Sequence, residues 1–308
     1  MMKTMSVVRR KLRRLREYGN IRGVLFFAQR RIHDDRARRR LARLVARFLP
    51  APAMSGPTLS PEAIDLEREG FAFFDGVLTP AIVAEMREHL ASRQVYDPYA
   101  IDRTYHEPFA AGLPDSHILT VEEEGLLECP HLLDVANNPR IIAAIEGVFG
   151  CKPTIGYISA WWSIPTTDGV PRQAENFHRD YDDVAFLKLF IYLSDVEAAT
   201  GPHEFIRGSH RDAELRPIRR FTDQEVYAAY SNNRLVQFTG KAGTVFLENT
   251  EGLHRGLPVH KGRRLILQVV YSMLPMAYGP AKPYRQRLFK EPSAPIDPYI
   301  NRIYVGQA

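Results

Sequence analysis

Residues 264–273 read RLILQVVYSM, a run of apolar and β-branched side chains that is typical of a buried β-strand. Similar runs of Val, Ile, Tyr, Phe, Trp and Leu precede it at residues 154–164, 184–193 and 244–247. Clusters of Gly, Pro, Asp and Asn bound these runs. Several short strands without long helices between them predict a β-sandwich or barrel.

A mainly helical part is expected before the strands. Its predicted helix starts share one pattern, an N-cap residue followed by proline at the first helical position: Ser60-Pro61, Thr79-Pro80 and Asn138-Pro139. We therefore expect residues 59–150 to be mainly helical and residues 151–275 to form the strand core. Residues 276–308 would then form a C-terminal tail.

The first 50 residues differ from the rest in charge. They hold 16 Lys and Arg against 3 acidic residues, a net charge of +13, so a chain of net charge +5 leaves −8 for the remainder. Apolar residues at helical spacing predict two basic amphipathic helices, one with Val8, Leu12 and Leu15 and one with Leu41, Leu44, Val45 and Phe48. Pro and Gly at residues 51–58 predict a linker between this basic arm and the rest of the chain, which contains all the candidate site residues.

The basic arm, residues 1–50, has several interpretations. A cationic amphipathic helix can lie on an anionic membrane surface, or it can pack its apolar side on the body and leave the arginines in water. Nucleic acid is a less favoured partner, because the body is acidic and the arm contains no known nucleic-acid module. An organelle transit peptide fits the arginine content, but serine is scarce in the arm.

Composition is that of an ordinary globular protein. The 308 residues, 45% hydrophobic and 25% charged, are enough to bury a sizeable core. No apolar run approaches the roughly 18 residues of a membrane-spanning helix. Cys129 and Cys151 have no spacing typical of a thiolate metal site. We expect a cytoplasmic protein without a transmembrane segment, with contact of the arm at the membrane surface as an alternative.

The residues that indicate chemistry begin with His178 and Asp180. In a strand, residues i and i+2 point to the same face with Cα atoms roughly 6.5 Å apart, so one metal ion could bind between them. His254 follows another predicted strand and could supply a third ligand. Two histidines and one carboxylate, with three positions open, form the ligand set that suits non-heme Fe(II).

Two adjacent arginines follow His254. Arg264 lies at the head of the last predicted strand, where a buried guanidinium could bind a carboxylate through two hydrogen bonds. Arg263 is the alternative, because strand alternation lets only one of the two side chains point inward.

At these motifs the chain resembles the phytanoyl-CoA dioxygenase (PhyH) family of Fe(II)- and 2-oxoglutarate-dependent oxygenases. The resemblance runs from about Phe71 to Tyr271 and is most specific in four stretches: HRD (178–180), YLSDVEAATGPHEFIRGSH (192–210), AGTVFLENTEGLH (242–254) and GRRLILQVVY (262–271). The chain departs from the family pattern at Thr200, where Asn is frequent, and at Arg207, where Pro is frequent. Both departures lie in a predicted loop. They affect what the resemblance implies about the substrate pocket and not what it implies about the iron site.

The resemblance implies a double-stranded β-helix, a cupin-like jelly roll flanked by helices. It implies that His178, Asp180 and His254 are the catalytic iron ligands and that Arg264 binds the distal carboxylate of 2-oxoglutarate, with O2 as the other co-substrate. Because residue 180 is Asp rather than Gly or Ala, no iron position is freed for a halide. Halogenation is therefore disfavoured. Hydroxylation of a small-molecule or lipid-linked metabolite is the expected reaction, while desaturation and epimerisation stay open.

Three further residues are candidates for substrate contact: Tyr157, Trp162 and His203. The two aromatic residues lie on the predicted strand before His178, and plain core packing is the alternative for both. His203 lies in the loop signature at residues 192–210. The competing function is a catalytically silent jelly-roll protein that binds an anionic surface or partner through the basic arm.

Overall fold

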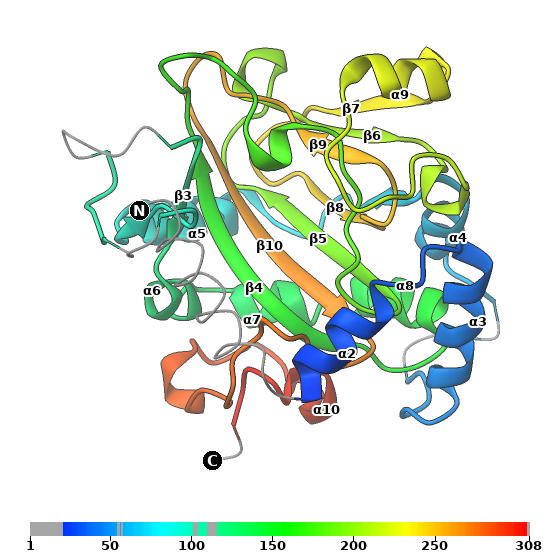
Figure 1. Cartoon of the computed structure of the whole chain (residues 1–308). Helices are drawn as coiled ribbons and strands as arrows, with labels where there is room; N and C mark the ends of the chain where they lie inside the picture. Colours follow the sequence, from blue (N-terminus) through cyan, green and yellow to red (C-terminus); the bar gives the residue numbers. More distant parts are fainter. Residues whose placement is uncertain (1–20, 54–55, 57, 101–103, 110–115, 307–308) are drawn as a thin grey trace, which may run out of the picture.

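The computed structural model describes residues 21–308 except 54–55, 57, 101–103, 110–115 and 307–308 (Figure 1). The predicted arm helix that contains Val8, Leu12 and Leu15 lies outside the described residues.

Two antiparallel sheets form the centre of the described chain. The larger has the strand order β1-β8-β5-β10-β4-β3-β2, and the smaller has the order β7-β6-β9. The strands are β1 (Phe71–Phe73), β2 (Val95–Tyr96), β3 (Ile118–Val121), β4 (Thr154–Ser163), β5 (Phe186–Tyr192), β6 (His203–Ile206), β7 (Leu235–Phe238), β8 (Val245–Glu248), β9 (His254–Gly256) and β10 (Arg264–Ser272). The expected mainly β core of the jelly-roll type is therefore confirmed.

The long strands β4, β10 and β5 lie side by side in the middle of the larger sheet (Figure 1). Both faces of these strands are covered, which explains why their sequences read as nearly continuous apolar runs. The register places Arg264 opposite Ser163 on β4. It also places Lys188 of β5 opposite Glu248 of β8. These two cross-strand pairs bring polar groups into the space between the sheets.

Helices cover the face of the larger sheet that points away from the smaller sheet. The predicted helix starts are confirmed, since the side chains of Ser60, Thr79 and Asn138 each cap a helix that has proline in its first turn. The helices are α4 (Pro61–Glu69), α5 (Pro80–Ala91), α6 (Glu123–Leu127), α7 (Leu132–Ala136) and α8 (Pro139–Phe149). Their buried apolar side chains form one core with the larger sheet.

Some elements differ from the expectation. Residues 59–150 contain the short strands β1, β2 and β3 in addition to helices. The segment with His178 is not a regular strand: Phe177 and His178 make only isolated bridges, the latter to His254. Such isolated bridges depend on backbone partners that are far away in the sequence, so the local alternation of side chains does not predict them.

The remaining described helices outside the arm lie in the C-terminal half. They are α9 (Asp223–Ala229), α10 (Pro298–Asn301) and single turns of 3-10 helix at Gln173–Glu175, Ala198–Thr200, Ser209–Arg211, Asn232–Arg234 and Gln286–Leu288. The tail is attached to the core, because the hydroxyl of buried Tyr304 accepts a hydrogen bond of 2.8 Å from the backbone N–H of Ile158.

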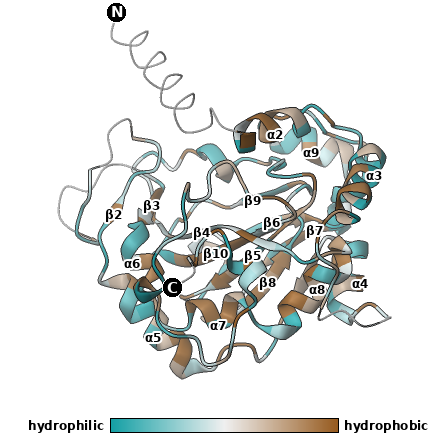
Figure 2. Cartoon of the chain, turned by 90° about the horizontal axis from the view of Figure 1, so that it is seen from below, coloured by the Kyte–Doolittle hydropathy of each residue, from teal (hydrophilic) through white to brown (hydrophobic). Residues whose placement is uncertain are grey.

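The described part of the basic arm contains α2 (Ile21–Gln29) and α3 (Asp35–Ala46). Leu41 and Val45 of α3 pack against the main core, and Arg38 is buried. The described part of the arm therefore packs on the body, as one of the interpretations expected, and the linker does not keep that part away from the body. The outer side of α2 carries hydrophobic residues at the edge of the molecule (Figure 2). None of the described helices is long and apolar enough to cross a membrane.

Candidate metal centre

His178, Asp180 and His254 come together between the two sheets. A backbone bridge holds the histidines, with N–H···O distances of 2.9 and 3.0 Å between residues 178 and 254. Oδ1 of Asp180 lies 3.8 Å from Nε2 of His178, and its Oδ2 lies 3.4 Å from Nε2 of His254. One ligand atom from each residue lies within 4.8 Å of the others, a spacing that could hold a single metal ion.

Backbone carbonyls orient both imidazole rings. Nδ1 of His178 lies 2.9 Å from the carbonyl oxygen of Asn176, and Nδ1 of His254 lies 2.9 Å from that of Gly252. Each Nδ1–H can donate to its carbonyl, which leaves the Nε2 lone pair free to bind a metal. The ligand atoms are thus directed toward one point before any metal binds.

Charge and burial set the protonation of this group. Burial and the neighbouring His254 hold the pKa of His178 well below its usual range, so the ring is neutral and able to bind metal. Burial raises the pKa of Asp180, but the Lys188 ammonium and the two histidines outweigh it and hold that pKa well below its ordinary value. Asp180 is therefore a carboxylate.

Arg264 lies in the same space. It is 5% exposed, and its Nη2 donates a hydrogen bond of 3.0 Å to Oγ of Ser163. Its Nε and Nη1 are buried and have no hydrogen-bond partner among the described residues. Buried donors of this kind are normally satisfied, so they fit a bound carboxylate. Arg263 points elsewhere: its guanidinium carbon lies 3.5 Å from the ring centroid of Phe109, and the side chain is exposed.

The cavity around these groups has a volume of about 260 Å³. Its lining includes His178, Asp180, His254 and Arg264, so the structure brings the predicted iron ligands and the predicted arginine into one site. Of the three candidate substrate residues, His203 lines the cavity, but Tyr157 and Trp162 do not. Trp162 packs in the main core and Trp161 lines the cavity, because adjacent strand residues face opposite sides.

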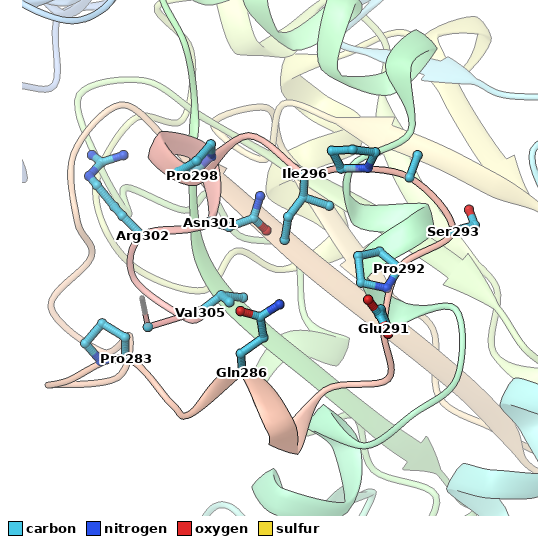
Figure 3. A pocket seen from close by; sticks show the side chains of 13 residues that line it. Pro283, Gln286, Glu291, Pro292, Ser293, Ile296, Pro298, Asn301, Arg302 and Val305 are labelled. Atoms are coloured by element: carbon cyan, nitrogen blue, oxygen red, sulfur yellow. The ribbon is translucent and has the colours of Figure 1, made fainter. Parts of the chain in front are cut away.

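A larger cavity of about 840 Å³ lies in the C-terminal tail (Figure 3). Its lining includes four prolines, Ile296 and Val305. Figure 3 labels three of these prolines, Pro283, Pro292 and Pro298. Its described lining residues include the carboxylate of Glu291 but no histidine or cysteine. This cavity therefore offers no metal-binding set, and the smaller cavity is the candidate site.

Sequence reasoning missed two polar residues that contact the site, Lys188 and Glu248. Lys188 lies 2.7 Å from Oδ2 of Asp180, and His203 Nε2 lies 2.7 Å from Oε2 of Glu248. Burial, with the charge of Asp180, raises the pKa of Glu248 to about 8, and burial lowers the pKa of His203 to about 3. A lysine inside the apolar run FLKLFIY was the available signal for the first of these residues.

His117 also faces the cavity. Its ring stacks on Tyr99 with 5.3 Å between the ring centroids, and the buried Nε2 has no hydrogen-bond partner among the described residues. Burial lowers the pKa of His117 to about 4, so the ring is neutral at pH 7. It can therefore offer one hydrogen bond to a bound molecule.

Comparison with known proteins identifies the family. The sequence model of the family "Phytanoyl-CoA dioxygenase (PhyH)" matches residues 66–264, well over half of the chain. This chain belongs to the phytanoyl-CoA dioxygenase family. As a member of the PhyH family it is an Fe(II)- and 2-oxoglutarate-dependent oxygenase, and its His-Asp-His group has the donors that suit iron. The expected cofactor and co-substrate are thus confirmed.

The solved structure of EctD agrees with this fold, and two further structures show a weaker similarity to the chain. EctD from S. alaskensis, with 2-oxoglutarate and 5-hydroxyectoine, has a TM-score of 0.53 and 20% identity over 84% of this chain and 94% of EctD. The carbocyclase SnoK from nogalamycin biosynthesis has a TM-score of 0.49 and 16% identity, over 72% of this chain and 86% of SnoK. HygX from Streptomyces hygroscopicus, with nickel and 2-oxoglutarate, has a TM-score of 0.48 and 16% identity, over 70% of this chain and 87% of HygX. No curated protein sequence matches the chain at a significant level.

Proposed function

We propose that this oxygenase hydroxylates a small molecule, with His178, Asp180 and His254 as the iron ligands. The observation that carries the proposal is the convergence of three metal-binding side chains and the unpartnered donors of Arg264 on one cavity. When bound, iron and 2-oxoglutarate supply the activation of O2. One oxygen atom enters the product, the other enters succinate, and carbon dioxide leaves.

The protein's own contribution is placement. The carbonyl contacts of both histidines keep Nε2 free, and Lys188 balances the buried charge of Asp180. Arg264 is proposed to bind the distal carboxylate of 2-oxoglutarate, with Ser163 holding one of its nitrogens. Surrounding apolar side chains such as Phe190 and Ile266 limit the access of water.

The cavity restricts the substrate. A volume of about 260 Å³ has to hold 2-oxoglutarate as well as the reacting carbon, so a small molecule, or one end of a lipid-linked one, fits. His203, Trp161 and His117 are the proposed contacts, since all three line the cavity outside the metal ligands. Neutral His117 and the aromatic ring of Trp161 favour an uncharged polar group such as a hydroxyl or a sugar face.

Binding of both cofactors can be tested without a substrate. Anaerobic protein with Fe(II) and 2-oxoglutarate should develop a weak visible charge-transfer band, because the keto acid would chelate iron at a two-histidine, one-carboxylate site. His178→Ala and Asp180→Ala should abolish the band, whereas His131→Ala, at a half-buried position outside the cavity lining, should keep it. A band that forms equally in the first two variants would refute the proposed ligands.

Turnover needs a substrate screen. Candidate metabolites are incubated with iron, 2-oxoglutarate and O2, and succinate and product mass are measured. A product heavier by one oxygen atom supports hydroxylation. Loss of two hydrogens, or an inverted centre at unchanged mass, indicates desaturation or epimerisation instead. A protein that binds both cofactors but forms no succinate with any candidate would favour the catalytically silent alternative.

We also propose that the outer side of the arm contacts an anionic membrane surface. Ile21, Val24 and Phe48 are 71%, 61% and 82% exposed. Exposed arginines accompany them on α3 and the adjoining turns: Arg31, Arg36, Arg40, Arg43 and Arg47. Exposed apolar side chains beside positive charge are typical of helices that lie on lipid headgroups.

A further inference from the structure

Arg38, in the described part of the arm, contacts the body through a buried side chain. The side chain is 2% exposed, and Nε donates a hydrogen bond of 2.8 Å to Oε1 of Glu251. Nη2 donates to the backbone oxygen of Asp183 at 2.5 Å, and Nη1 donates to Oε1 of Gln29 at 2.9 Å. The guanidinium carbon also lies 5.0 Å from the ring centroid of Tyr181. A buried guanidinium is tolerated because these contacts satisfy it.

The acceptors of Arg38 belong to the two segments that carry the metal ligands. Residues 178–183, the first ligand segment, begin with His178 and end with Asp183. Residues 249–254, the second ligand segment, contain Glu251 and end with His254. One side chain from the arm thus bonds to both ligand segments, through a carboxylate in one and a backbone carbonyl in the other.

Other contacts also join the ligand segments, including Nη1 of Arg179, which donates a hydrogen bond of 2.6 Å to the carbonyl oxygen of Glu251. The backbone bridge between His178 and His254 joins them at one end, and the N–H of Asp180 donates to the carbonyl of Thr250 at 2.8 Å. Arg38 closes the opposite end, at Asp183 and Glu251. A second arm contact supports the same region, because Nε2 of Gln29 donates to the carbonyl of Tyr181 at 2.7 Å.

We propose that Arg38 is a positioning residue of the metal centre, which sets the spacing of the two ligand segments. The proposal rests on the proposed iron ligands and extends the site to a residue of the N-terminal arm. Asp180 lies in one segment and His254 in the other, so their 3.4 Å approach depends on how the segments are held together. Residues that orient metal ligands from outside typically change metal affinity by about 10- to 100-fold.

The test uses full-length protein and Co(II) as a spectroscopic probe. Arg38→Met removes the forked donor and keeps an unbranched apolar side chain, Arg38→Lys keeps the charge but loses the fork, and Glu251→Gln weakens the contact in the second segment. Arg40→Met, an exposed arginine on the same helix, is the matched control. The Co(II) dissociation constant, the visible Co(II) spectrum and the midpoint of thermal unfolding are measured for each protein.

Arg38→Met is expected to weaken Co(II) binding about 10-fold and to change the visible spectrum, with Arg38→Lys and Glu251→Gln intermediate and Arg40→Met unchanged. If Arg38→Met does not fold, the lysine and glutamine variants provide the same readouts. Lower unfolding midpoints with unchanged Co(II) affinity and spectrum, well below the transition, would overturn the proposal and leave Arg38 a stabilising contact only. Absence of Co(II) binding by the unmodified protein would refute the proposed iron ligands instead.

Discussion

The ammonium group of Lys188 lies 2.7 Å from Oδ2 of Asp180 and 2.9 Å from Oδ2 of Asp182. Burial lowers the pKa of Lys188, but the two carboxylates outweigh it and raise that pKa above its ordinary value. Lys188 is therefore a permanent cation beside the proposed iron ligand. It stabilises the carboxylate form of Asp180 and holds one of its two oxygens.

Lys188→Met should weaken Fe(II) or Co(II) binding by about 10- to 100-fold, because it leaves Asp180 without its balancing charge. The metal dissociation constant measured by anaerobic titration tests this. Lys241→Met is the control, since Lys241 is 81% exposed and pairs with Asp195 at the surface. Equal metal affinity in the two variants would show that Lys188 does not support the metal centre.

Arg264→Ala should weaken 2-oxoglutarate binding by about 30-fold to a few thousand-fold. Truncation of one partner in a buried charge pair costs about 2–5 kcal/mol. Arg263→Ala should have a much smaller effect, because the Arg263 side chain stacks on Phe109 and does not line the cavity. Titration of 2-oxoglutarate into the anaerobic Fe(II) protein distinguishes them, and the reverse ranking would move the carboxylate site to Arg263.

The free energy of unfolding of the Glu248→Gln variant should increase relative to that of the unmodified protein, both without metal, as pH rises from about 5 to about 8. The pKa of Glu248 is raised to about 8 in the folded protein, so the folded state holds a proton that the unfolded state releases near its ordinary value of 4.5. The stability that this proton provides is present at low pH and is lost as pH rises through the folded pKa. The side-chain amide of the Glu248→Gln variant cannot ionise, so the variant avoids that loss.

Denaturant unfolding at several pH values measures this difference, which should grow by no more than about 1.4 kcal/mol per pH unit. Glu88→Gln, at an exposed position on α5, is the matched control. A stability difference that is constant over this range would mean that Glu248 is ionised in the folded protein.

Full-length protein should co-sediment with anionic vesicles and release as salt rises. Attraction at such a surface is worth about 1 kcal/mol per Lys or Arg and decays within a Debye length of about 10 Å at 0.1 M salt. Val24→Glu, on the outer side of α2, should reduce binding, whereas Val170→Glu, at an exposed position outside the arm, should not. Equal sedimentation with neutral vesicles, or no effect of Val24→Glu, would contradict the proposed membrane contact.

Local patterns in the sequence were sufficient for much of the fold. The Ser60-Pro61 helix start and the apolar run of β10 both follow from interactions between neighbouring residues, which the chain order itself determines. The grouping of His178, Asp180 and His254 was predicted from ligand chemistry and family resemblance, and the fold brings these side chains together.

The sequence did not determine which face of each strand points into the cavity. Alternation predicts that Arg263 and Arg264 point in opposite directions, as do Trp161 and Trp162, but it does not say which member of each pair faces the cavity. The register of β10 against β4 decides this, since it places Arg264 beside Ser163. Register depends on the packing of whole sheets and not on the local pattern.

The supporting contacts were determined only by the tertiary structure. Arg38 lies 213 residues from Glu251 along the chain, and the sequence suggested only that its helix was basic and amphipathic. Lys188 and Glu248 face each other because β5 pairs with β8. The local sequence determined where helices and strands form, whereas burial between distant segments determined which charged side chains became part of the site, because the partner of a buried charge is selected by proximity in space.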